Sequence, residues 1–252
     1  DSAAAIAVGT VMAGKRDPEA VCVALASDHV VGDAEAFRAD CKRAASLAAT
    51  GLIMTLGIKP THPSTAYGYL APGEALPEPD ASRLSRFVEK PKLDIAEKYV
   101  AEGYLWNSGN FLFSAKTMRD ELSRHAPAVL SAAEAAVNKA SRDLDFLRLD
   151  PESFGKAVKI SIDYAVMERT AHAGMLAASF DWSDVGSWDS IHAIKPQDSD
   201  GNVLEGPAVA RRVAGVEAQR VLVQLAGAGG RAMRAQVLGR GAEHAAHREQ
   251  GP

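Results

Sequence analysis

The feature that most constrains the fold is an alternation of short apolar runs with an amphipathic segment near the start of the chain. Residues 21–25 and 52–56 are apolar runs of strand length, typical of strands covered on both faces. Between them, residues 33–49 place apolar side chains along one stripe, which predicts a helix that ends at Gly51. Strand, helix and strand in this order predict a right-handed parallel crossover and therefore an α/β sheet.

The length and charge of the chain limit the class of protein. A chain of 252 residues is long enough for one large α/β domain, and a net charge of −4 gives no electrostatic support for nucleic-acid binding. No run reaches the length of a membrane span. The apolar opening, residues 2–13, lacks the basic flank of a signal peptide and is typical of a helix cut from a longer protein. Cys22 and Cys41 have no metal-site or redox spacing, so reduced thiols and a cytoplasmic location are expected.

Charged residues end an aromatic strand in the middle of the chain. Residues 86–91 read Arg-Phe-Val-Glu-Lys-Pro. Because proline cannot continue a central ladder, Glu89 and Lys90 are expected at the mouth of the strand, where open α/β sheets present ligand-binding groups. A carboxylate can accept hydrogen bonds from two sugar hydroxyls, and an ammonium group can neutralise a phosphate. A solvated charge pair before a turn is the alternative interpretation.

A second aromatic strand contains a polar insert. Residues 104–113 read Tyr-Leu-Trp-Asn-Ser-Gly-Asn-Phe-Leu-Phe, with a helix expected over 93–102 between the two strands. A glycine within a strand indicates a bulge or a close approach of the backbone to another group. The amide of Asn107 is therefore a candidate reader of sugar hydroxyls, and a hairpin turn at 107–110 is the alternative.

Two aspartates follow strand-like runs that lie far apart in the sequence. Asp28 comes after the run 21–25, and Asp184 lies in the acid-rich segment 180–188. A carboxylate just beyond the end of a buried strand is well placed for a hard cation, and Mg²⁺ takes few carboxylates plus phosphate oxygens. A turn cap at Asp28 and an ordinary loop at 180–188 are the alternatives.

Three further segments complete the set of candidates. Gly68, in the segment 65–69 that reads Thr-Ala-Tyr-Gly-Tyr, would permit close backbone approach to a ligand, or simply mark a turn. Residues 160–168 begin a helix with Ser161 or Asp163 near its cap. Two outer helices are expected over 116–125 and 128–142, with solvated charged faces.

Together these motifs resemble the bacterial mannose-1-phosphate guanylyltransferases, which are sugar-phosphate nucleotidyltransferases. In chain order the family pattern includes Pro-Ser-Asp-His, Gly-Ile-x-Pro-Thr, Thr-Gly-Tyr-Gly-Tyr, Phe-Val-Glu-Lys-Pro, Tyr-Leu-Trp-Asn-Ser-Gly-Met-Phe, Ser-Ile-Asp-Tyr-Ala-Val-Met-Glu and Trp-x-Asp-x-Gly-x-Trp. This chain departs from that pattern at Ala26, Ala66 and Asn110. If position 66 requires a positive φ, Ala66 costs about 1 kcal/mol.

The resemblance implies a fold, a reaction and a site. The implied fold is α/β, a three-layer sandwich of the nucleotide-diphospho-sugar transferase (Rossmann-like) type, truncated at the N-terminus. The implied reaction converts GTP and mannose 1-phosphate into GDP-mannose and pyrophosphate. The resemblance implies that the catalytic residues holding Mg²⁺ are Asp28 and Asp184, and that the substrate-binding residues are Gly68, Glu89, Lys90, Asn107 and Asp163.

The resemblance covers residues 3–206 only. The family's Gly-Gly-x-Gly-x-Arg loop, which holds the nucleotide triphosphate, does not occur in the sequence, so we expect no turnover from these 252 residues. Residues 207–252 lack Asp, Asn, Lys, Ser, Thr, Ile, Phe, Tyr and Trp, which indicates a frameshifted reading or a genuine low-complexity tail. The expected organisation is a partial nucleotidyltransferase domain at 1–206 and this tail at 207–252, with little strand pattern in the tail.

Other classes of protein remain open at this point. A non-catalytic relative that binds sugar nucleotides, a broken gene product, and a guanylyltransferase for another sugar phosphate are the competing interpretations. The sequence is compatible with a homo-oligomer but does not determine the oligomeric state.

Overall fold

The structure is a computed structural model that describes residues 1–199, 201–203, 208–209, 222–226 and 232–236. The chain divides into two compact units, Asp1–Asp184 and Val185–Pro252. The helices of the first unit are α1 (Ser2–Arg16), α2 (Ala34–Ala48), α3 (Leu93–Ala101), α4 (Ala115–His125), α5 (Pro127–Asn138), α6 (Pro151–Gly155) and the π-helical turn η1 (Asp163–Met167). Its strands are β1 (Val21–Ala24), β2 (Val30–Val31), β3 (Ile53–Ile58), β4 (Tyr69–Ala75), β5 (Ala81–Val88), β6 (Leu105–Ser114), β7 (Ser141–Asp143), β8 (Phe146–Arg148), β9 (Ala173–Ala177) and β10 (Trp182–Ser183).

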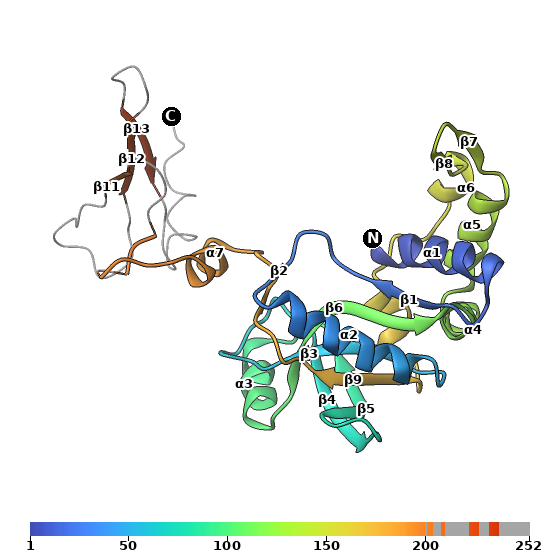
Figure 1. The fold of residues 1–252 in the computed structure, drawn as a ribbon, viewed down its shortest axis with the longest axis horizontal. Coiled ribbons are helices and arrows are strands. Elements are labelled where there is room, and N and C mark those ends of the chain that lie inside the picture. The colour runs from blue at the N-terminus through green and yellow to red at the C-terminus, as the bar shows by residue number, and fades with distance from the viewer. Residues whose placement is uncertain (200, 204–207, 210–221, 227–231, 237–252) are drawn as a thin grey trace, which may run out of the picture. The chain divides into compact units, whose positions relative to one another are not determined.

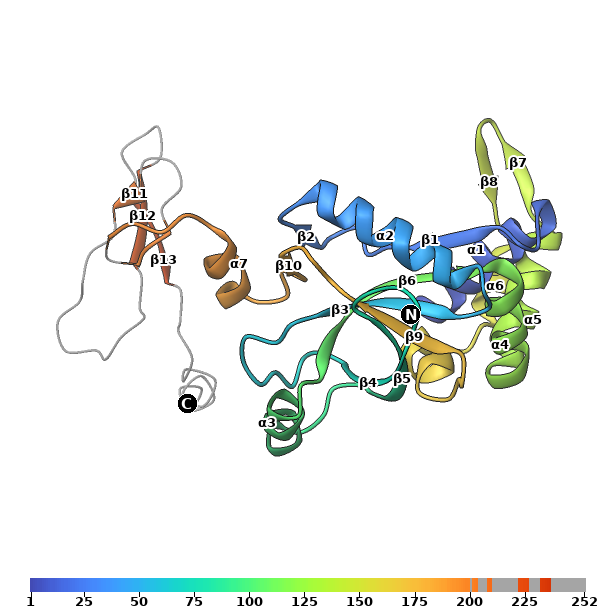
Figure 2. The same ribbon diagram turned by 60° about the horizontal axis from the view of Figure 1, so that its bottom comes forward.

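The first unit is built on a mixed six-stranded sheet with the strand order β1-β6-β3-β9-β5-β4 (Figures 1 and 2). Apolar side chains form two separate cores. One core joins α1, α4, α5 and η1 to the sheet through residues such as Val8, Leu122 and Phe113. The other joins α2 and α3 to the sheet through residues such as Leu47 and Leu112. Helix, sheet and helix make three layers, so the predicted α/β sandwich is confirmed.

Helix α2 has the start and end that the sequence predicts. The side chain of Asp33 caps it by accepting hydrogen bonds from the backbone N–H groups of Glu35 (2.9 Å) and Ala36 (3.0 Å). Gly51, with φ of 96°, lies just beyond its C-terminal end. The apolar stripe of α2, including Ala44 and Leu47, packs on the sheet.

The parallel relation of the first two long strands is confirmed, but another strand lies between them. β1 and β3 each pair antiparallel with β6, so they run in the same direction, and β3 pairs parallel with β9. The expectation that both strands are covered on both faces holds for β3, which is fully buried, and is wrong for β1. Val21 is 36% and Val23 46% exposed, because β1 is the end strand of the described sheet.

The polar insert lies within strand β6 and is not a hairpin. β6 is continuous over Leu105–Ser114, and its register against β3 shifts between the pairs Thr55–Phe111 and Gly57–Asn107. Gly109 has a φ of 72°, a left-handed conformation that glycine adopts without steric cost. The register shift agrees with the bulge that was one of the two expectations for this glycine, and the hairpin interpretation is wrong.

Both predicted outer helices form, but α5 ends at Asn138, short of the expected residue 142, and Ser141–Asp143 form strand β7. One charged residue of α4 is not solvated. Glu121 of α4 is 2% exposed, and its carboxylate contacts Arg124 and His125. The expectation of entirely solvated charged faces is wrong at this position, because a helical period alone does not show which neighbouring element covers a turn.

The second unit contains α7 (Trp188–Ile194) and the strands β11 (Ala208–Val209), β12 (Leu222–Ala226) and β13 (Ala232–Gln236). Ser187 caps α7 by accepting a hydrogen bond from the backbone N–H of Ser190 (3.1 Å). The three strands form an antiparallel sheet, although the composition of residues 207–252 indicated little strand pattern. Most of that predicted tail lies outside the described residues, and its boundary after Gly206 stays a prediction. No helix in the described part of the chain has the length and apolar character needed to cross a membrane.

Candidate functional site

The side chain of Asn107, in β6, is held by hydrogen bonds from three segments. Its oxygen accepts from the hydroxyl of Thr55 (2.8 Å) and from the backbone N–H of Gly109 (3.2 Å). Its nitrogen donates to Oδ1 of Asp163 (3.1 Å). A side-chain amide accepts two hydrogen bonds and donates two. Within the described residues, one N–H of Asn107 is therefore left for a ligand.

The neighbours of Asn107 and Asp163 include Gly68, Glu89 and Lys90. The backbone N–H of Asn107 donates to the carbonyl of Gly68 (2.8 Å). A Cβ added to Gly68 would lie 2.6 Å from Oε2 of Glu89, so glycine permits this close approach. Nζ of Lys90 is 3.5 Å from Oε1 of Glu89, and the charge of Asp163 acts on the same carboxylate. We call these five residues, Gly68, Glu89, Lys90, Asn107 and Asp163, the Asn107 cluster.

Carboxylates outnumber cations in the Asn107 cluster. Burial raises the pKa of Glu89, whose side chain is 11% exposed, and the charge of Asp163 raises it further, whereas Lys90 lowers it. Burial also raises the pKa of Asp163, against hydrogen bonds from Ser161 and Asn107. A desolvated carboxylate is stabilised by hydrogen-bond donors. A ligand rich in hydroxyl groups would supply them.

The two predicted metal ligands flank the same end of a short two-stranded ladder. β10 pairs antiparallel with β2, with Ser183 opposite Val30. Continued by one residue, this register sets Asp184 opposite His29, which directly follows Asp28. No group of three or more His, Cys, Asp or Glu side chains suited to a metal occurs in the part of the chain that the structure describes. A pair of carboxylates nevertheless fits Mg²⁺, which binds one or two of them together with phosphates and water.

A row of aromatic rings connects the Asn107 cluster with the two aspartates. Successive ring centroids lie 5.0, 4.8, 5.5 and 5.2 Å apart, in the order His62, Trp106, Tyr67, Trp182 and His29. The indole N–H of Trp182 donates to Nδ1 of His29 (3.2 Å). Trp106 directly precedes Asn107, and His29 directly follows Asp28, so the row has a member next in sequence to each group. We call these five rings the aromatic row.

Sequence reasoning missed three residues of this region. Thr55 fixes Asn107, the hydroxyl of Tyr67 donates to Oδ1 of Asp184 (2.9 Å), and Oε1 of Glu168 accepts from the backbone N–H of Glu89 (3.2 Å). Thr55 carries the sole hydroxyl of β3, and a polar side chain in an apolar strand was a usable signal. The contacts of Tyr67 and Glu168 join residues far apart in the sequence, and no local sequence pattern predicts them.

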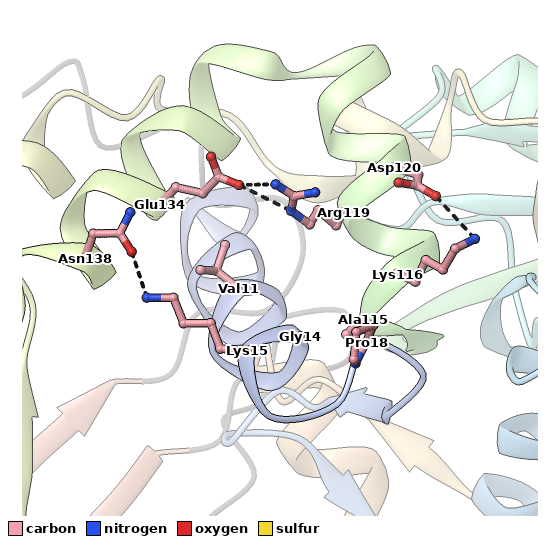
Figure 3. Close-up of a pocket in the computed structure, with 10 residues that line it drawn as sticks. All are labelled: Val11, Gly14, Lys15, Pro18, Ala115, Lys116, Arg119, Asp120, Glu134 and Asn138. Atoms are coloured by element: carbon pink, nitrogen blue, oxygen red, sulfur yellow. Dashed lines mark hydrogen bonds and ion pairs between the residues drawn. The ribbon is translucent and has the colours of Figure 1, made fainter.

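A cavity of about 520 Å³ bordered by α1, α4 and α5 lies away from these residues. Figure 3 shows that its polar side chains are paired with one another: Lys15 with Asn138, Arg119 with Glu134, and Lys116 with Asp120. The backbone N–H groups of Ala115 and Lys116, at the start of α4, donate to the carbonyls of Ala20 and Pro18. We therefore take the Asn107 cluster as the candidate functional site.

Comparisons with known proteins show which proteins the chain is similar to. The mannose-1-phosphate guanylyltransferase of Sinorhizobium fredii is 44% identical over 212 residues, which are 83% of this chain and 41% of that protein. The Escherichia coli mannose-1-phosphate guanylyltransferase is 43% identical over 215 residues, 83% of this chain and 45% of that protein. The solved structure of a protein named mannose-1-phosphate geranyltransferase, from Thermus thermophilus, superposes with a TM-score of 0.69 at 36% identity. That superposition covers 79% of this chain and 56% of the solved one.

The chain thus spans less than half the length of these two curated relatives. A model of the nucleotidyl transferase family matches residues 1–201, which is most of the chain. The chain therefore belongs to the nucleotidyl transferase family.

Proposed function

We propose that this chain carries the sugar-phosphate-binding and metal-binding part of a mannose-1-phosphate guanylyltransferase. Such an enzyme transfers the GMP group of GTP to mannose 1-phosphate and releases pyrophosphate. The observation that carries the proposal is that Glu89, Asn107 and Asp163 lie together although they come from three distant segments. Gly68 lies close against the Glu89 carboxylate of this group. The curated relatives supply the identity of the sugar.

Each member of the Asn107 cluster has a role that follows from its surroundings. Glu89 and Asp163 accept hydrogen bonds from mannose hydroxyls, and the remaining N–H of Asn107 donates to one. The side chain of Lys90, 58% exposed, attracts the sugar's phosphate. Gly68 lets the Glu89 carboxylate keep its position beside the sugar, because a Cβ at residue 68 would lie 2.6 Å from Oε2 of Glu89.

In the proposed reaction, a phosphate oxygen of mannose 1-phosphate forms a bond to the α-phosphorus of GTP while the bond from that phosphorus to pyrophosphate breaks. Asp28 and Asp184 would hold Mg²⁺, which when bound neutralises phosphate charge. The chain's own contribution is to hold the sugar so that its phosphate is presented in a fixed orientation. This contribution can be measured without GTP.

The test is isothermal titration of the whole chain with mannose 1-phosphate. Glu89→Gln keeps the shape of the side chain and removes its charge. Because a hydrogen bond to a charged group contributes about 1.5–3 kcal/mol, we expect affinity to fall about 10- to 100-fold. The matched control is Glu97→Gln on the exposed surface of α3, which should bind like the wild type.

Two outcomes would contradict the proposal. If the wild type does not bind mannose 1-phosphate, or if both glutamate variants bind equally well, the Asn107 cluster is not the sugar site. Glucose 1-phosphate, which differs from mannose 1-phosphate in the orientation of one hydroxyl, tests the choice of sugar. Tighter binding of glucose 1-phosphate would keep the cluster as a sugar site and overturn the assignment to mannose.

A further inference from the structure

The hydroxyl of Tyr67 is placed to hold one oxygen of a proposed metal ligand. Tyr67 precedes β4 and is partly buried, and its hydroxyl donates to Oδ1 of Asp184 at 2.9 Å. A carboxylate that binds a cation through one oxygen is oriented when a hydroxyl donates to the other, and such outer partners tune the affinity of metal sites.

The ring of Tyr67 is fixed by its neighbours in the aromatic row. Its centroid lies 4.8 Å from that of Trp106 and 5.5 Å from that of Trp182, at interplanar angles of 59° and 68°. Tilted and edge-to-face arrangements at these distances are favourable. Because packing already restricts the ring, little rotamer freedom is lost when the hydroxyl meets Asp184.

The same segment of chain touches the sugar half of the site. Gly68 follows Tyr67 directly, its carbonyl accepts from the backbone N–H of Asn107, and a Cβ added to it would lie 2.6 Å from Oε2 of Glu89. Trp106, which packs on the Tyr67 ring, directly precedes Asn107. A movement of Tyr67 therefore affects Asp184 through the tyrosine hydroxyl. It affects the Asn107 cluster through the peptide unit that joins Tyr67 to Gly68.

We propose that Tyr67 is a positioning residue that orients Asp184 for a divalent cation and makes cation binding and sugar-phosphate binding depend on each other. This inference rests on the proposed function, since it takes Asp184 as a metal ligand and the Asn107 cluster as the sugar site. It assigns to Tyr67 a task that neither Asp184 nor Asn107 performs alone, because each of them belongs to one half of the site.

The test measures binding on the whole chain, with Mn²⁺ as the probe cation because carboxylate sites accept it. Three titrations are made for each variant: Mn²⁺ alone, mannose 1-phosphate alone, and mannose 1-phosphate in saturating Mn²⁺. Tyr67→Phe removes the hydroxyl and keeps the ring. Tyr104→Phe is the matched control, because Tyr104 is also partly buried and stacks on Tyr99 at 4.4 Å, outside the aromatic row. Asp184→Asn is the reference for loss of the cation site.

In the wild type we expect Mn²⁺ to strengthen mannose 1-phosphate binding at least about five-fold. In Tyr67→Phe, Mn²⁺ affinity should fall about ten-fold or more, and the ratio of sugar-phosphate affinities with and without Mn²⁺ should approach one. Its affinity for mannose 1-phosphate alone and its thermal midpoint should stay near those of Tyr104→Phe. A residue that acted only through fold stability would lower both affinities together and would leave their ratio unchanged.

The outcomes separate this inference from the proposed function. If Asp184→Asn lowers Mn²⁺ affinity and Tyr67→Phe does not, or if the ratio survives in Tyr67→Phe, the positioning role is overturned and the metal site stands. If the wild type does not bind Mn²⁺, or Asp184→Asn binds it as tightly as the wild type, the metal site of the proposed function is wrong, and the inference is wrong with it.

Discussion

At the scale of single residues, the close contact between Gly68 and Glu89 constrains the candidate site. A Cβ at position 68 would meet Oε2 of Glu89 at 2.6 Å and the side chains of Asn107 and Phe87 at 3.3 and 3.4 Å. The nearest of these atoms ends a flexible side chain, so an alanine can be accommodated if the carboxylate moves. The lack of a side chain at residue 68 therefore matters more for the position of the Glu89 carboxylate than for the stability of the fold. Ala66, by contrast, is not among the residues with positive φ in the described chain, so no strain arises there.

We predict that Gly68→Ala weakens mannose 1-phosphate binding about ten-fold or more, since displacing the carboxylate removes a charged hydrogen bond of about 1.5–3 kcal/mol. Titration calorimetry measures the affinity, and urea unfolding should show a much smaller change in stability. Gly9→Ala is the control: Gly9 lies in α1 with no atom within 4 Å of an added Cβ, so binding should be unchanged and stability should rise by about 0.5–1 kcal/mol. Unchanged binding in Gly68→Ala would show that Glu89 does not hold the sugar.

The raised pKa values of Glu89 and Asp163 predict a pH dependence of stability. The folded chain keeps protons that the unfolded chain releases near the ordinary values of 4.5 and 3.8, so the stabilising contribution is complete below those values. It is lost as the pH rises through the raised pKa values, and the free energy of unfolding falls. In urea unfolding from about pH 4 to about pH 7, Glu89→Gln should therefore show a shallower fall than the wild type. The exposed Glu35→Gln serves as the matched control. If the free energy of unfolding falls as steeply with pH in Glu89→Gln as in the wild type, Glu89 is not a source of the pH dependence.

At the scale of elements, a buried aspartate ties α2 to the connection that leads from β9 to β10. Oδ2 of Asp40, a residue 1% exposed, accepts hydrogen bonds from the backbone N–H (2.7 Å) and the hydroxyl (2.9 Å) of Ser179. Its other oxygen pairs with Arg43 at 3.1 Å, and Arg43 also pairs with Glu78 at 2.6 Å. This network fixes the start of the segment that carries Asp184.

We predict that Asp40→Ala lowers the free energy of unfolding by about 3 kcal/mol, because it leaves the donors of Ser179 without an acceptor in a buried place. Asp40→Asn should lose less, since its amide oxygen can still accept from Ser179. Glu35→Ala, which removes an exposed ion pair with Arg38, should change stability by less than about 1 kcal/mol. Chemical denaturation of the three variants makes the comparison, and equal losses in Asp40→Ala and Glu35→Ala would rule out the network as a stabilising one.

At the scale of the whole molecule, the chain consists of one well-packed unit and a second unit with little burial in its described helix. The split falls after Asp184. Helix α7 of the second unit has no buried residue, and Trp188 is 72% exposed. A helix with no buried residue opens readily to a protease.

We predict that limited proteolysis cleaves within 207–252 and leaves a resistant core that ends between Asp184 and Gly206. Mass spectrometry of the core gives the boundary and distinguishes the split after Asp184 from the predicted one after Gly206. The core should keep the unfolding midpoint of the intact chain, because both apolar cores lie within residues 3–182. Resistance of the entire segment 207–252 would show that it is a folded part of the protein.

The sequence by itself determined the class of fold and the positions of its main elements. Apolar runs and the apolar stripe of residues 33–49 predicted β3 and α2, because burial of apolar surface and the helical period are local properties. The motifs around Glu89, Asn107 and Asp184 likewise marked candidate ligands, and the first two now lie in one cluster with Gly68, Lys90 and Asp163.

Only the tertiary structure decided which elements are neighbours. Strand β6 lies between β1 and β3, and the exposure of Val23 follows from the end position of β1, although the run 21–25 is as apolar as 52–56. The contacts of Thr55 with Asn107 and of Tyr67 with Asp184 join residues 52 and 117 positions apart. Pairing of this kind depends on the packing of the whole sheet, and local propensity carries no information about it.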